Sequence, residues 1–235
     1  MIFDPLYLLV IGIGLGLSLY ASTITKGRFR KYSQYTTRSR MTGADIARSI
    51  LEDNNIRDVK VERIPGELSD HYDPRTKVLR LSEPVYDSNS MAAFGVAAHE
   101  VGHAIQHAKS YSMLQFRSAW VPVANYGGGI STFVIILAFV MGGAASATGS
   151  TLSWLGVLLF GCTTVFTLVT LPVEFDASKR ALVCLKQGNY VTEKELDGAR
   201  KVLNAAAMTY VAAFITSLLT LLYYAYRLGL LGGRR

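Results

Sequence analysis

The stretch that decides the fold begins at Ser118 and reads SAWVPVANYGGGISTFVIILAFVMGGAASATGSTLSWLGVLLFGCTTVFTLVTLPV, ending at Val173. It contains 56 residues and no Lys, Arg, Asp or Glu. Because one membrane-spanning helix needs about 20 apolar residues, a stretch of this length predicts two spans joined by an uncharged turn. We place these spans at residues 119–143 and 152–173. The chain is therefore expected to be an integral membrane protein.

Two further apolar segments, at residues 5–24 and 202–226, bring the number of predicted spans to four. The first segment follows Asp4 and precedes a basic stretch. This charge order is the reverse of the order in a cleaved signal peptide, so we interpret the segment as an uncleaved anchor with its N-terminus outside the cell. A multi-pass protein follows from this interpretation, with the lipid bilayer as its partner.

The composition agrees with a membrane protein. Of the 235 residues, 50% are hydrophobic and 17% are charged, and the mean hydropathy is +0.27. Soluble domains contain about 25% charged residues. These values exclude a disordered chain, a collagen and a coiled coil. The two cysteines, Cys162 and Cys184, lack the spacing of a disulfide framework or a CxxC metal site, so we expect two free thiols.

The basic residues predict which side of the membrane the polar segments occupy. Lys and Arg number 24 against 17 Asp and Glu, a net charge of +7. Residues 26–40 and 174–201 contain six Lys or Arg each, whereas the opposite side contains chiefly Arg227, Arg234 and Arg235. Because basic residues near span ends stay in the cytoplasm, both polar segments are predicted to be cytoplasmic. Topology alone explains the basic stretch, so we expect no nucleic-acid partner.

The first polar segment, residues 25–118, is long enough for a small α+β domain. Thr42 and Asp45 form the pattern of a capping box, and Ser88 and Ser90 are cap candidates for a later helix. Alternating apolar and charged residues between Gly and Pro turns indicate short strands. The predicted elements are a helix at about 43–54, strands at about 59–62 and 77–81, and a helix at about 91–109.

The last of these helices contains His99-Glu100-Val101-Gly102-His103, an HExxH motif. Residues four apart lie on one face of a helix, so the two imidazoles can bind one cation and the carboxylate beside the first can reach a water there. This is the geometry of zinc hydrolases. Gly102 lowers helix stability by about 1 kcal/mol relative to Ala. A glycine at this position is therefore best explained by a substrate or another backbone that comes too close for a side chain.

A catalytic zinc site takes three protein ligands and keeps one position for water, so a third ligand must come from elsewhere. The candidates are His71, His107, Glu174, Asp176 and Glu193. His107 lies one turn, about 6 Å, beyond His103 and is too far along the helix to complete a tetrahedron. His71 lies in a predicted exposed turn at residues 70–74. Glu174 is the first charge after the uncharged stretch, where it either joins the motif or simply marks the end of a span.

Two stretches carry a resemblance to a known family, SMAAFGVAAHEVGHAIQ at residues 90–106 and LPVEFDAS at residues 171–178. They resemble the YugP-like bacterial membrane zinc metallopeptidases, over most of the chain and in the order of the spans. The chain is similar, more distantly, to the gluzincin peptidases of membranes, which pair HExxH with a downstream ExxxD whose Glu is the third zinc ligand. The residues that this resemblance implies are His99, His103 and Glu174 as ligands of one Zn²⁺, and Glu100 as the general base.

One position departs from the gluzincin pattern. Four residues after Glu174 the chain has Ser178 instead of the Asp of ExxxD. Asp176 is a candidate for the hydrogen bond that orients a ligand histidine from behind. The group that performs this role stays open at the level of sequence.

The predicted fold class is a mostly α integral membrane protein with four transmembrane helices and a small α+β zincin-like catalytic domain between spans 1 and 2. The resemblance implies a bacterial plasma membrane, and the charge distribution places the active site on the cytoplasmic side. The predicted domains are an anchor at 1–24, a cytoplasmic catalytic domain at 25–118, two transmembrane helices at 119–173, a cytoplasmic segment with the third zinc ligand at 174–201, and a fourth transmembrane helix with its tail at 202–235.

The predicted function is zinc-dependent cleavage of polypeptides in or beside the membrane, with Glu100 as the general base. The strand at 77–81 is expected to offer a free edge to an extended peptide, although its Lys and Arg are equally typical of an edge protected from pairing. The candidates for stabilising the oxyanion are Tyr72, Arg80, His107 and Tyr111. The sequence gives no prediction of the oligomeric state.

Two other functions fit part of the pattern. One is a zinc-binding membrane scaffold or regulator without protease activity, but a structural site does not require Glu100 beside its ligands. The other is a small transporter or channel, which four spans would suit. No ionisable residue lies near the middle of any predicted span, however, and such residues mark ion pathways. The sequence therefore favours a peptidase.

Overall fold

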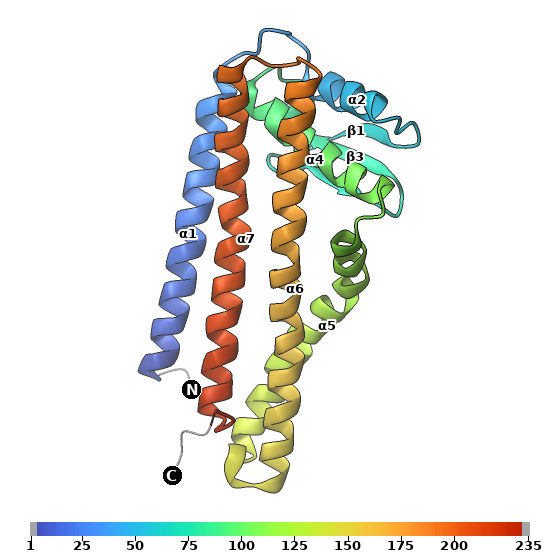
Figure 1. Ribbon diagram of the computed structural model, residues 1–235. Coiled ribbons are helices and arrows are strands. Elements are labelled where there is room, and N and C mark those ends of the chain that lie inside the picture. The colour runs from blue at the N-terminus through green and yellow to red at the C-terminus, as the bar shows by residue number, and fades with distance from the viewer. Residues whose placement is uncertain (1–3, 232–235) are drawn as a thin grey trace. The chain divides into compact units, whose positions relative to one another are not determined.

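Four long helices dominate the computed structural model, which describes residues 4–231 (Figure 1). They are α1 (Pro5–Ser33), α5 (Ser112–Val140), α6 (Ala147–Gln187) and α7 (Glu193–Arg227). Each is long and apolar enough to cross a membrane, by length and composition. The prediction of four such helices is confirmed. Of the basic tail, Arg234 and Arg235 lie outside the described residues.

The long helices extend past the predicted ends of the spans. The clearest cases are α1, which ends at Ser33 rather than residue 24, α6, which ends at Gln187 rather than residue 173, and α7, which begins at Glu193 rather than residue 202. The helices therefore run beyond the predicted spans, whose ends stay predictions. Charged residues mark where a chain leaves an apolar layer, but Lys, Arg, Glu and Ala are good helix formers and do not stop a helix. The polar extension of α6 carries Glu174.

The described residues form two compact units. One contains residues 4–20, 116–171 and 210–231, and the other contains residues 21–115 and 172–209. Each of the four long helices contributes residues to both units.

The first unit consists of apolar helix segments and the short 3₁₀ helix η1 (Gly143–Ala145). Its buried cluster contains Val10, Ile135, Ala138, Tyr223, Tyr224 and Leu228. Many of its large apolar side chains are exposed instead, including Phe133 (68%) and Val140 (76%). Extensive exposed apolar surface of this kind marks contact with a membrane or another protein, and lipid acyl chains suit these helices.

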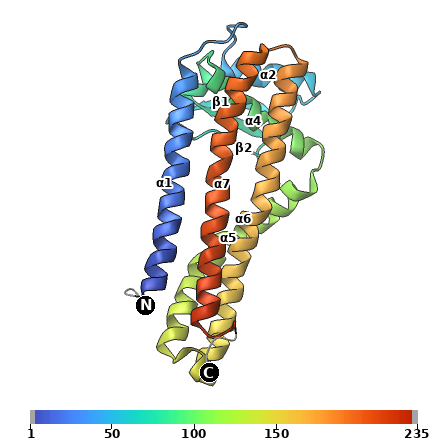
Figure 2. The ribbon, with the colours of Figure 1, turned by 60° about the vertical axis from the view of Figure 1, so that its left-hand side comes forward.

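The second unit adds three short helices and a sheet to the polar ends of the long helices (Figures 1 and 2). Its elements are α2 (Gly43–Asp53), β1 (Lys60–Ile64), β2 (His71–Asp73), β3 (Val78–Ser82), α3 (Glu83–Tyr86) and α4 (Met91–Ala108). The strand order is β1-β3-β2, with β1 parallel and β2 antiparallel to β3. The elements predicted near 43–54, 59–62, 77–81 and 91–109 are therefore present, with small shifts of their ends.

Two predictions about this sheet are wrong. The strand predicted at 77–81 has no free edge, because β3 is the central strand and pairs on both sides. Residues 70–74 are not simply a turn, because His71–Asp73 form the edge strand β2. A three-residue strand is too short to show a periodic pattern, and its neighbours Asp70 and Pro74 are typical turn residues. Four of the five residues of β3 are buried, as suits a central strand.

Side-chain caps fix the beginnings of α2 and α4. Thr42 Oγ1 accepts a hydrogen bond from the Asp45 backbone N at 3.2 Å, and Asp45 Oδ2 accepts one from the Thr42 backbone N at 3.0 Å. The predicted capping box is thus confirmed. Ser90 caps α4 by accepting a hydrogen bond from the backbone N of Ala93. Capping satisfies donors that the first turn of a helix leaves unpaired, so the HExxH helix has a defined start.

Small residues let α4 approach α6 and α7 closely. A Cβ on Gly102 would lie 2.4 Å from the carbonyl oxygen of Ala177 in α6, and one on Gly95 would lie 3.3 Å from the Cβ of Ala199 in α7. The helix is buried along most of its length. The expectation that Gly102 marks a close approach is confirmed, and the approaching group is the backbone of α6. This contact brings α4 beside the part of α6 that carries Glu174.

Candidate metal centre

Three side chains converge where α4 meets α6. His99 and His103 come from α4 and Glu174 from α6, and one ligand atom from each lies within 4.8 Å of the others. Glu174 Oε2 lies 3.2 Å from His99 Nε2 and 3.6 Å from His103 Nε2. The imidazole rings stand nearly perpendicular, at 81° with centroids 4.8 Å apart. Both Nε2 atoms therefore face one buried carboxylate, which is 2% exposed.

The arrangement fits a zinc ion. Two imidazole nitrogens and one carboxylate oxygen form a common donor set of catalytic zinc. Around a tetrahedral zinc with bonds of about 2.0–2.2 Å, neighbouring ligand atoms lie about 3.3–3.6 Å apart. The distances of 3.2 and 3.6 Å between the Glu174 oxygen and the two nitrogens agree with this geometry. The cluster could thus hold one metal ion.

The far side of each imidazole is hydrogen-bonded. His99 Nδ1 lies 3.1 Å from Ser178 Oγ, and His103 Nδ1 lies 3.0 Å from Gln106 Oε1. Gln106 Oε1 can only accept, so Nδ1 of His103 carries a proton, and Nε2, which faces Glu174, is the nitrogen left to bind a cation. The same tautomer of His99 lets its Nδ1–H donate to Ser178. Both rings are oriented for binding a cation through Nε2.

Gln106 is fixed by its own contacts. Its Nε2 donates at 2.8 Å to the backbone oxygen of Val173 and at 2.8 Å to Asp176 Oδ2. Because both of these partners only accept, the amide orientation that presents Oε1 to His103 is the one that satisfies the network. The side chain is fully buried, so a lost partner would leave a buried polar group unpaired.

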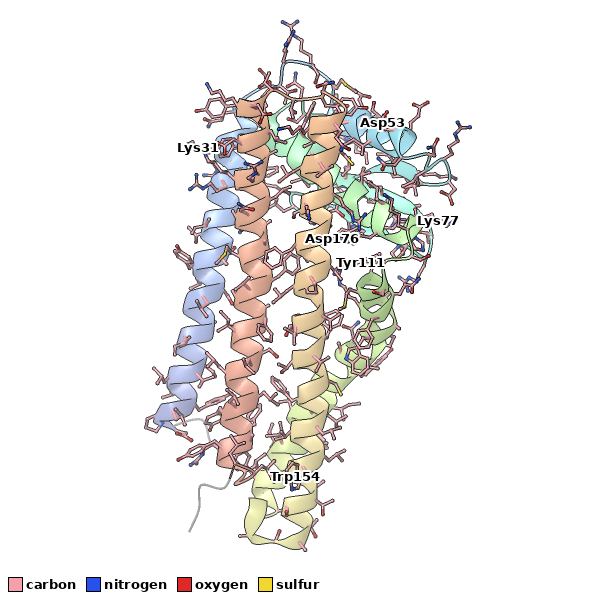
Figure 3. The ribbon with its side chains drawn as sticks, viewed as in Figure 1. Lys31, Asp53, Lys77, Tyr111, Trp154 and Asp176 are labelled. Carbon is pink, nitrogen blue, oxygen red and sulfur yellow. The ribbon has the colours of Figure 1, made fainter. Side chains whose placement is uncertain are left out.

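Asp176 links this network to the outside of the site. It accepts hydrogen bonds from Gln106 and from Arg180 Nε. The guanidinium carbon of Arg180 also lies 5.8 Å from the ring centroid of Tyr111, near the start of α5. Figure 3 labels both Asp176 and Tyr111. The chain Arg180–Asp176–Gln106–His103 thus runs from a half-buried ion pair to an imidazole of the cluster.

These contacts resolve the departure seen in the sequence. Ser178, at the position of the expected Asp, contacts His99 directly. Among the described residues 4–231, Asp176 forms no hydrogen bond with His99 or His103 and reaches His103 through Gln106 instead. Sequence reasoning did not single out Gln106, although its position three residues after His103 places it on the same helix face. That spacing was the available signal.

Glu100 is buried on α4 beside His99. Burial raises the pKa of its carboxyl group, and the nearby His99 and His103 oppose that shift without cancelling it. For His103, burial lowers the pKa, but the hydrogen bond and charge of Glu174 outweigh burial and the pKa is raised.

The other third-ligand candidates lie away from this cluster. Asp176 is engaged by Gln106 and Arg180 as described above. His71 is exposed, with its Nδ1 2.9 Å from the backbone oxygen of Ser69. His107 Nδ1 lies 2.8 Å from the hydroxyl of Tyr72, and Glu193 is exposed and pairs with Lys186 at 2.8 Å. Within residues 4–231, the group that offers a metal three His, Cys, Asp or Glu ligands is the cluster of His99, His103 and Glu174.

The four candidates for stabilising the oxyanion have different surroundings. Burial, with the charges of Asp58 and Asp73, raises the pKa of Tyr72 to about 12, so this phenol stays neutral and able to donate a hydrogen bond. Its contact with His107 makes these two candidates a pair. Arg80, on β3, lies 3.5 Å from Glu62 Oε2, and Tyr111 lies under Arg180. Geometry alone does not rank them.

Comparison with known proteins agrees with this site. A family model described as "Putative neutral zinc metallopeptidase" matches residues 7–229. A relative from Bacillus subtilis (strain 168), "Putative membrane protease YugP", is 44% identical over 210 residues, which cover 89% of this chain and 91% of the relative. No solved structure matches the chain. The predicted resemblance is confirmed, and zinc is the metal that the family implies for the cluster. With a match along nearly its whole length, the chain belongs to the family described as "Putative neutral zinc metallopeptidase".

Proposed function

We propose that the chain hydrolyses peptide bonds with one Zn²⁺ held by His99, His103 and Glu174, and with Glu100 as the general base. The observation that carries this proposal is the convergence of the three ligand atoms within 4.8 Å beside a glutamate of an HExxH helix. Membership of a zinc metallopeptidase family supports the identity of both the metal and the reaction.

Each residue near the cluster has a distinct task in this proposal. Zinc, when bound, supplies a Lewis acid that lowers the pKa of a water toward about 7 and polarises a carbonyl group. Ser178 and Gln106 hold the two imidazoles with Nε2 toward the cation. Glu100 accepts the proton of the attacking water on its carboxylate and returns it to the nitrogen of the leaving amine. The burial of Glu174 limits competition by water for the carboxylate.

The position of Glu174 supports the proposal that the substrates are polypeptides in or beside the membrane. It directly follows the uncharged stretch that ends at Val173, so the cluster lies near the end of an apolar layer. The basic segments 26–40 and 174–201 support a cytoplasmic location of the cluster in a plasma membrane. In this organisation, the catalytic domain at 25–118 is completed by the third ligand from segment 174–201, between anchors at 1–24, 119–173 and 202–235.

Metal content and cleavage together test the proposal. We expect about one zinc per purified chain, measured by elemental analysis, and a sharp fall in Glu174→Ala. Glu193→Ala is the matched control, because Glu193 is an exposed carboxylate that pairs with Lys186, outside the cluster. The purified wild type should cleave an unfolded polypeptide, lose this activity to a chelator and regain it with zinc. Full zinc content in Glu174→Ala would contradict the ligand set, and zinc binding without any cleavage would favour the scaffold alternative.

A further inference from the structure

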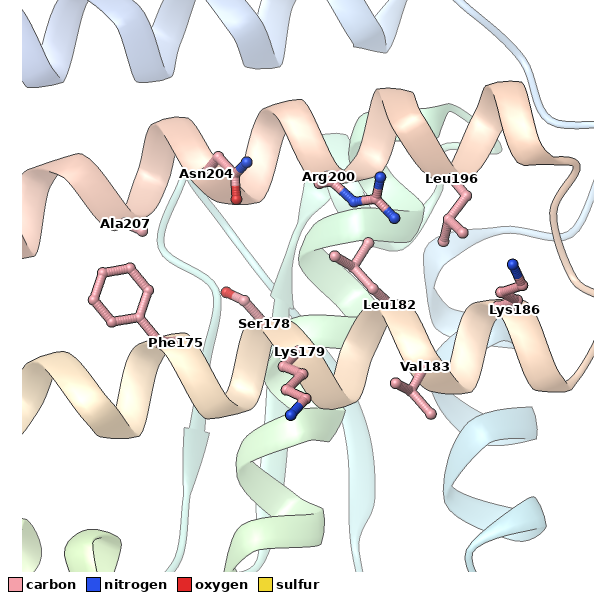
Figure 4. Close-up of a pocket in the computed structure, with 10 residues that line it drawn as sticks. All are labelled: Phe175, Ser178, Lys179, Leu182, Val183, Lys186, Leu196, Arg200, Asn204 and Ala207. Carbon is pink, nitrogen blue, oxygen red and sulfur yellow. The ribbon is translucent and has the colours of Figure 1, made fainter.

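A pocket of about 360 Å³ lies between the polar ends of α6 and α7 (Figure 4). Its wall from α6 includes Phe175 and Lys179, and its wall from α7 includes Arg200 and Ala207. Ser178 also lines it, on the side where its hydroxyl oxygen contacts His99. The pocket therefore adjoins the support of the metal cluster but is formed by a different face of α6 from the one that carries Glu174.

Two cations of this pocket are free to bind an anion. Lys186, a third basic residue of the lining, pairs with Glu193 at 2.8 Å. Lys179 and Arg200 form no ion pair with any residue in the described range 4–231. The acidic residues of the same helix segments are engaged elsewhere: Glu174 with the two histidines, Asp176 with Arg180, Glu195 with backbone N–H groups and Asp197 with Lys201. Neighbouring carboxylates act on these two cations only at longer range, Asp176 on Lys179 and Glu193 and Asp197 on Arg200, so the pocket keeps an excess of positive charge.

Both free cations stand at the ends of uncharged helix segments. Lys179 lies six residues after Val173, about 9 Å along the axis of α6. Arg200 lies two residues before the uncharged segment 202–226 of α7. The polar layer on each side of a bilayer is about 5–8 Å thick. Two helices of different sequence therefore place a cation at the level of lipid headgroups, and the apolar Phe175 and Ala207 lie on the membrane side of these cations.

We propose that this pocket binds the headgroup phosphate of an anionic phospholipid. Lys179 and Arg200 contact the phosphate, and the beginning of an acyl chain lies along Phe175 and Ala207. Basic pockets between transmembrane helices recognise anionic headgroups by this combination of charge and apolar surface. In the His99 tautomer whose Nδ1–H donates to Ser178, the hydroxyl proton of Ser178 is left for a phosphate oxygen. This inference does not depend on the proposed peptidase activity.

Lipid binding to the purified full-length protein tests the inference, by native mass spectrometry in detergent with phosphatidylglycerol or phosphatidylcholine added. The test variant is Lys179→Gln with Arg200→Gln. The control is Arg57→Gln with Lys194→Gln, which removes the same charge from exposed positions outside the pocket and leaves Asp197 paired with Lys201. At about 1 kcal/mol per basic residue, the affinity for phosphatidylglycerol should fall about thirtyfold in the test variant and little in the control.

Each alternative result overturns the inference in a different way. An equal loss in the test and control variants would show general attraction to the charged surface rather than a pocket. Equal affinity of the wild type for phosphatidylglycerol and phosphatidylcholine would exclude recognition of headgroup charge. Displacement of phosphatidylglycerol by millimolar inorganic phosphate would assign the pocket to a soluble anion. Circular dichroism of both variants checks that the helices are intact.

Discussion

The two halves of α6 differ although they belong to one helix. Residues 147–171 contain no charge and expose large apolar side chains, among them Trp154 (59%) and Leu158 (65%). Residues 172–187 bury Glu174 at 2% exposure and engage Asp176 in a polar network. The apolar half is suited to lipid, and the polar half is suited to a cation. Hydropathy thus identifies the part of α6 that is suited to a membrane, whereas contact with α4 identifies the part that carries the metal-ligand candidate.

Backbone proximity explains why only one half carries the site. At Ala177 the backbone of α6 is so near α4 that a Cβ on Gly102 would lie 2.4 Å from a carbonyl oxygen. At Gly161, in the apolar half, a Cβ would meet nothing within 4 Å. Close contact excludes water and brings Glu174 within reach of two imidazoles. Changes of similar size in the two halves should therefore have very different effects.

Removing the charge of Glu100 should have the largest effect on function. In Glu100→Gln the side chain keeps its shape but no longer accepts the proton of a water, so we expect cleavage to fall by about 10²–10⁴-fold. Zinc content should stay near that of the wild type, because Glu100 is not in the ligand cluster. Initial rates with a polypeptide substrate and elemental analysis of the same sample measure both quantities.

Glu52→Gln is the control for this change. Glu52 is an exposed carboxylate on α2, so its variant should cleave at the wild-type rate. Wild-type cleavage by Glu100→Gln would contradict the assignment of the general base. Loss of zinc from Glu100→Gln would mean that Glu100 supports the cluster itself.

Adding one methyl group should destabilise the protein where α4 contacts the polar half of α6, but not in the apolar half of α6. Gly102→Ala forces α4 away from α6, and overpacking of this kind lowers the free energy of unfolding by about 1–3 kcal/mol. Zinc content should fall as well, because Glu174 comes from α6 and the histidines from α4. Gly161→Ala should leave both quantities unchanged or raise stability slightly. Thermal unfolding in detergent measures the difference, and equal melting temperatures of the two variants would refute the role of close packing.

Much of the membrane part and of the cluster could be predicted from sequence, because each leaves a local signal. An uncharged stretch of 56 residues has few alternatives to membrane helices. His99 and His103 are defined by spacing on one helix. Glu174 was one of several third-ligand candidates; its place directly after the uncharged stretch favoured it, and the family resemblance strengthened that preference.

The remaining features depend on contacts between distant segments and leave no such signal. The order of the sheet, with β3 in the centre, is decided by the pairing of three short strands. Helix propensity permits the polar extension of α6, but it does not show that this segment packs against α4. Gln106 matters only because the fold brings Val173 and Asp176 to its amide. A glutamine on a helix is otherwise unremarkable in sequence.

Truncating Gln106 should weaken metal binding through His103. Gln106→Ala removes the acceptor that orients His103, and it leaves the backbone oxygen of Val173 without its side-chain donor. Loss of a group that orients a ligand histidine lowers metal affinity by about 10–100-fold. Competition for zinc with a chelator of known affinity measures this change. Gln115→Ala is the control because Gln115 is exposed; equal zinc affinity in both variants would show that Gln106 is only a packing residue.

The smallest of these effects should come from Ser178, whose hydroxyl oxygen makes one 3.1 Å contact with His99 Nδ1. In Ser178→Ala, a water can take the place of the half-buried hydroxyl, so we expect zinc affinity to fall by about tenfold, at the low end of the range for such groups. Ser178→Thr keeps the hydroxyl and should retain most of the affinity. Ser153→Ala is the matched change in the apolar half, where the hydroxyl only donates to the backbone oxygen of Gly149 four residues earlier. It should bind zinc like the wild type, and a loss in Ser153→Ala as large as in Ser178→Ala would erase the difference between the two halves of α6.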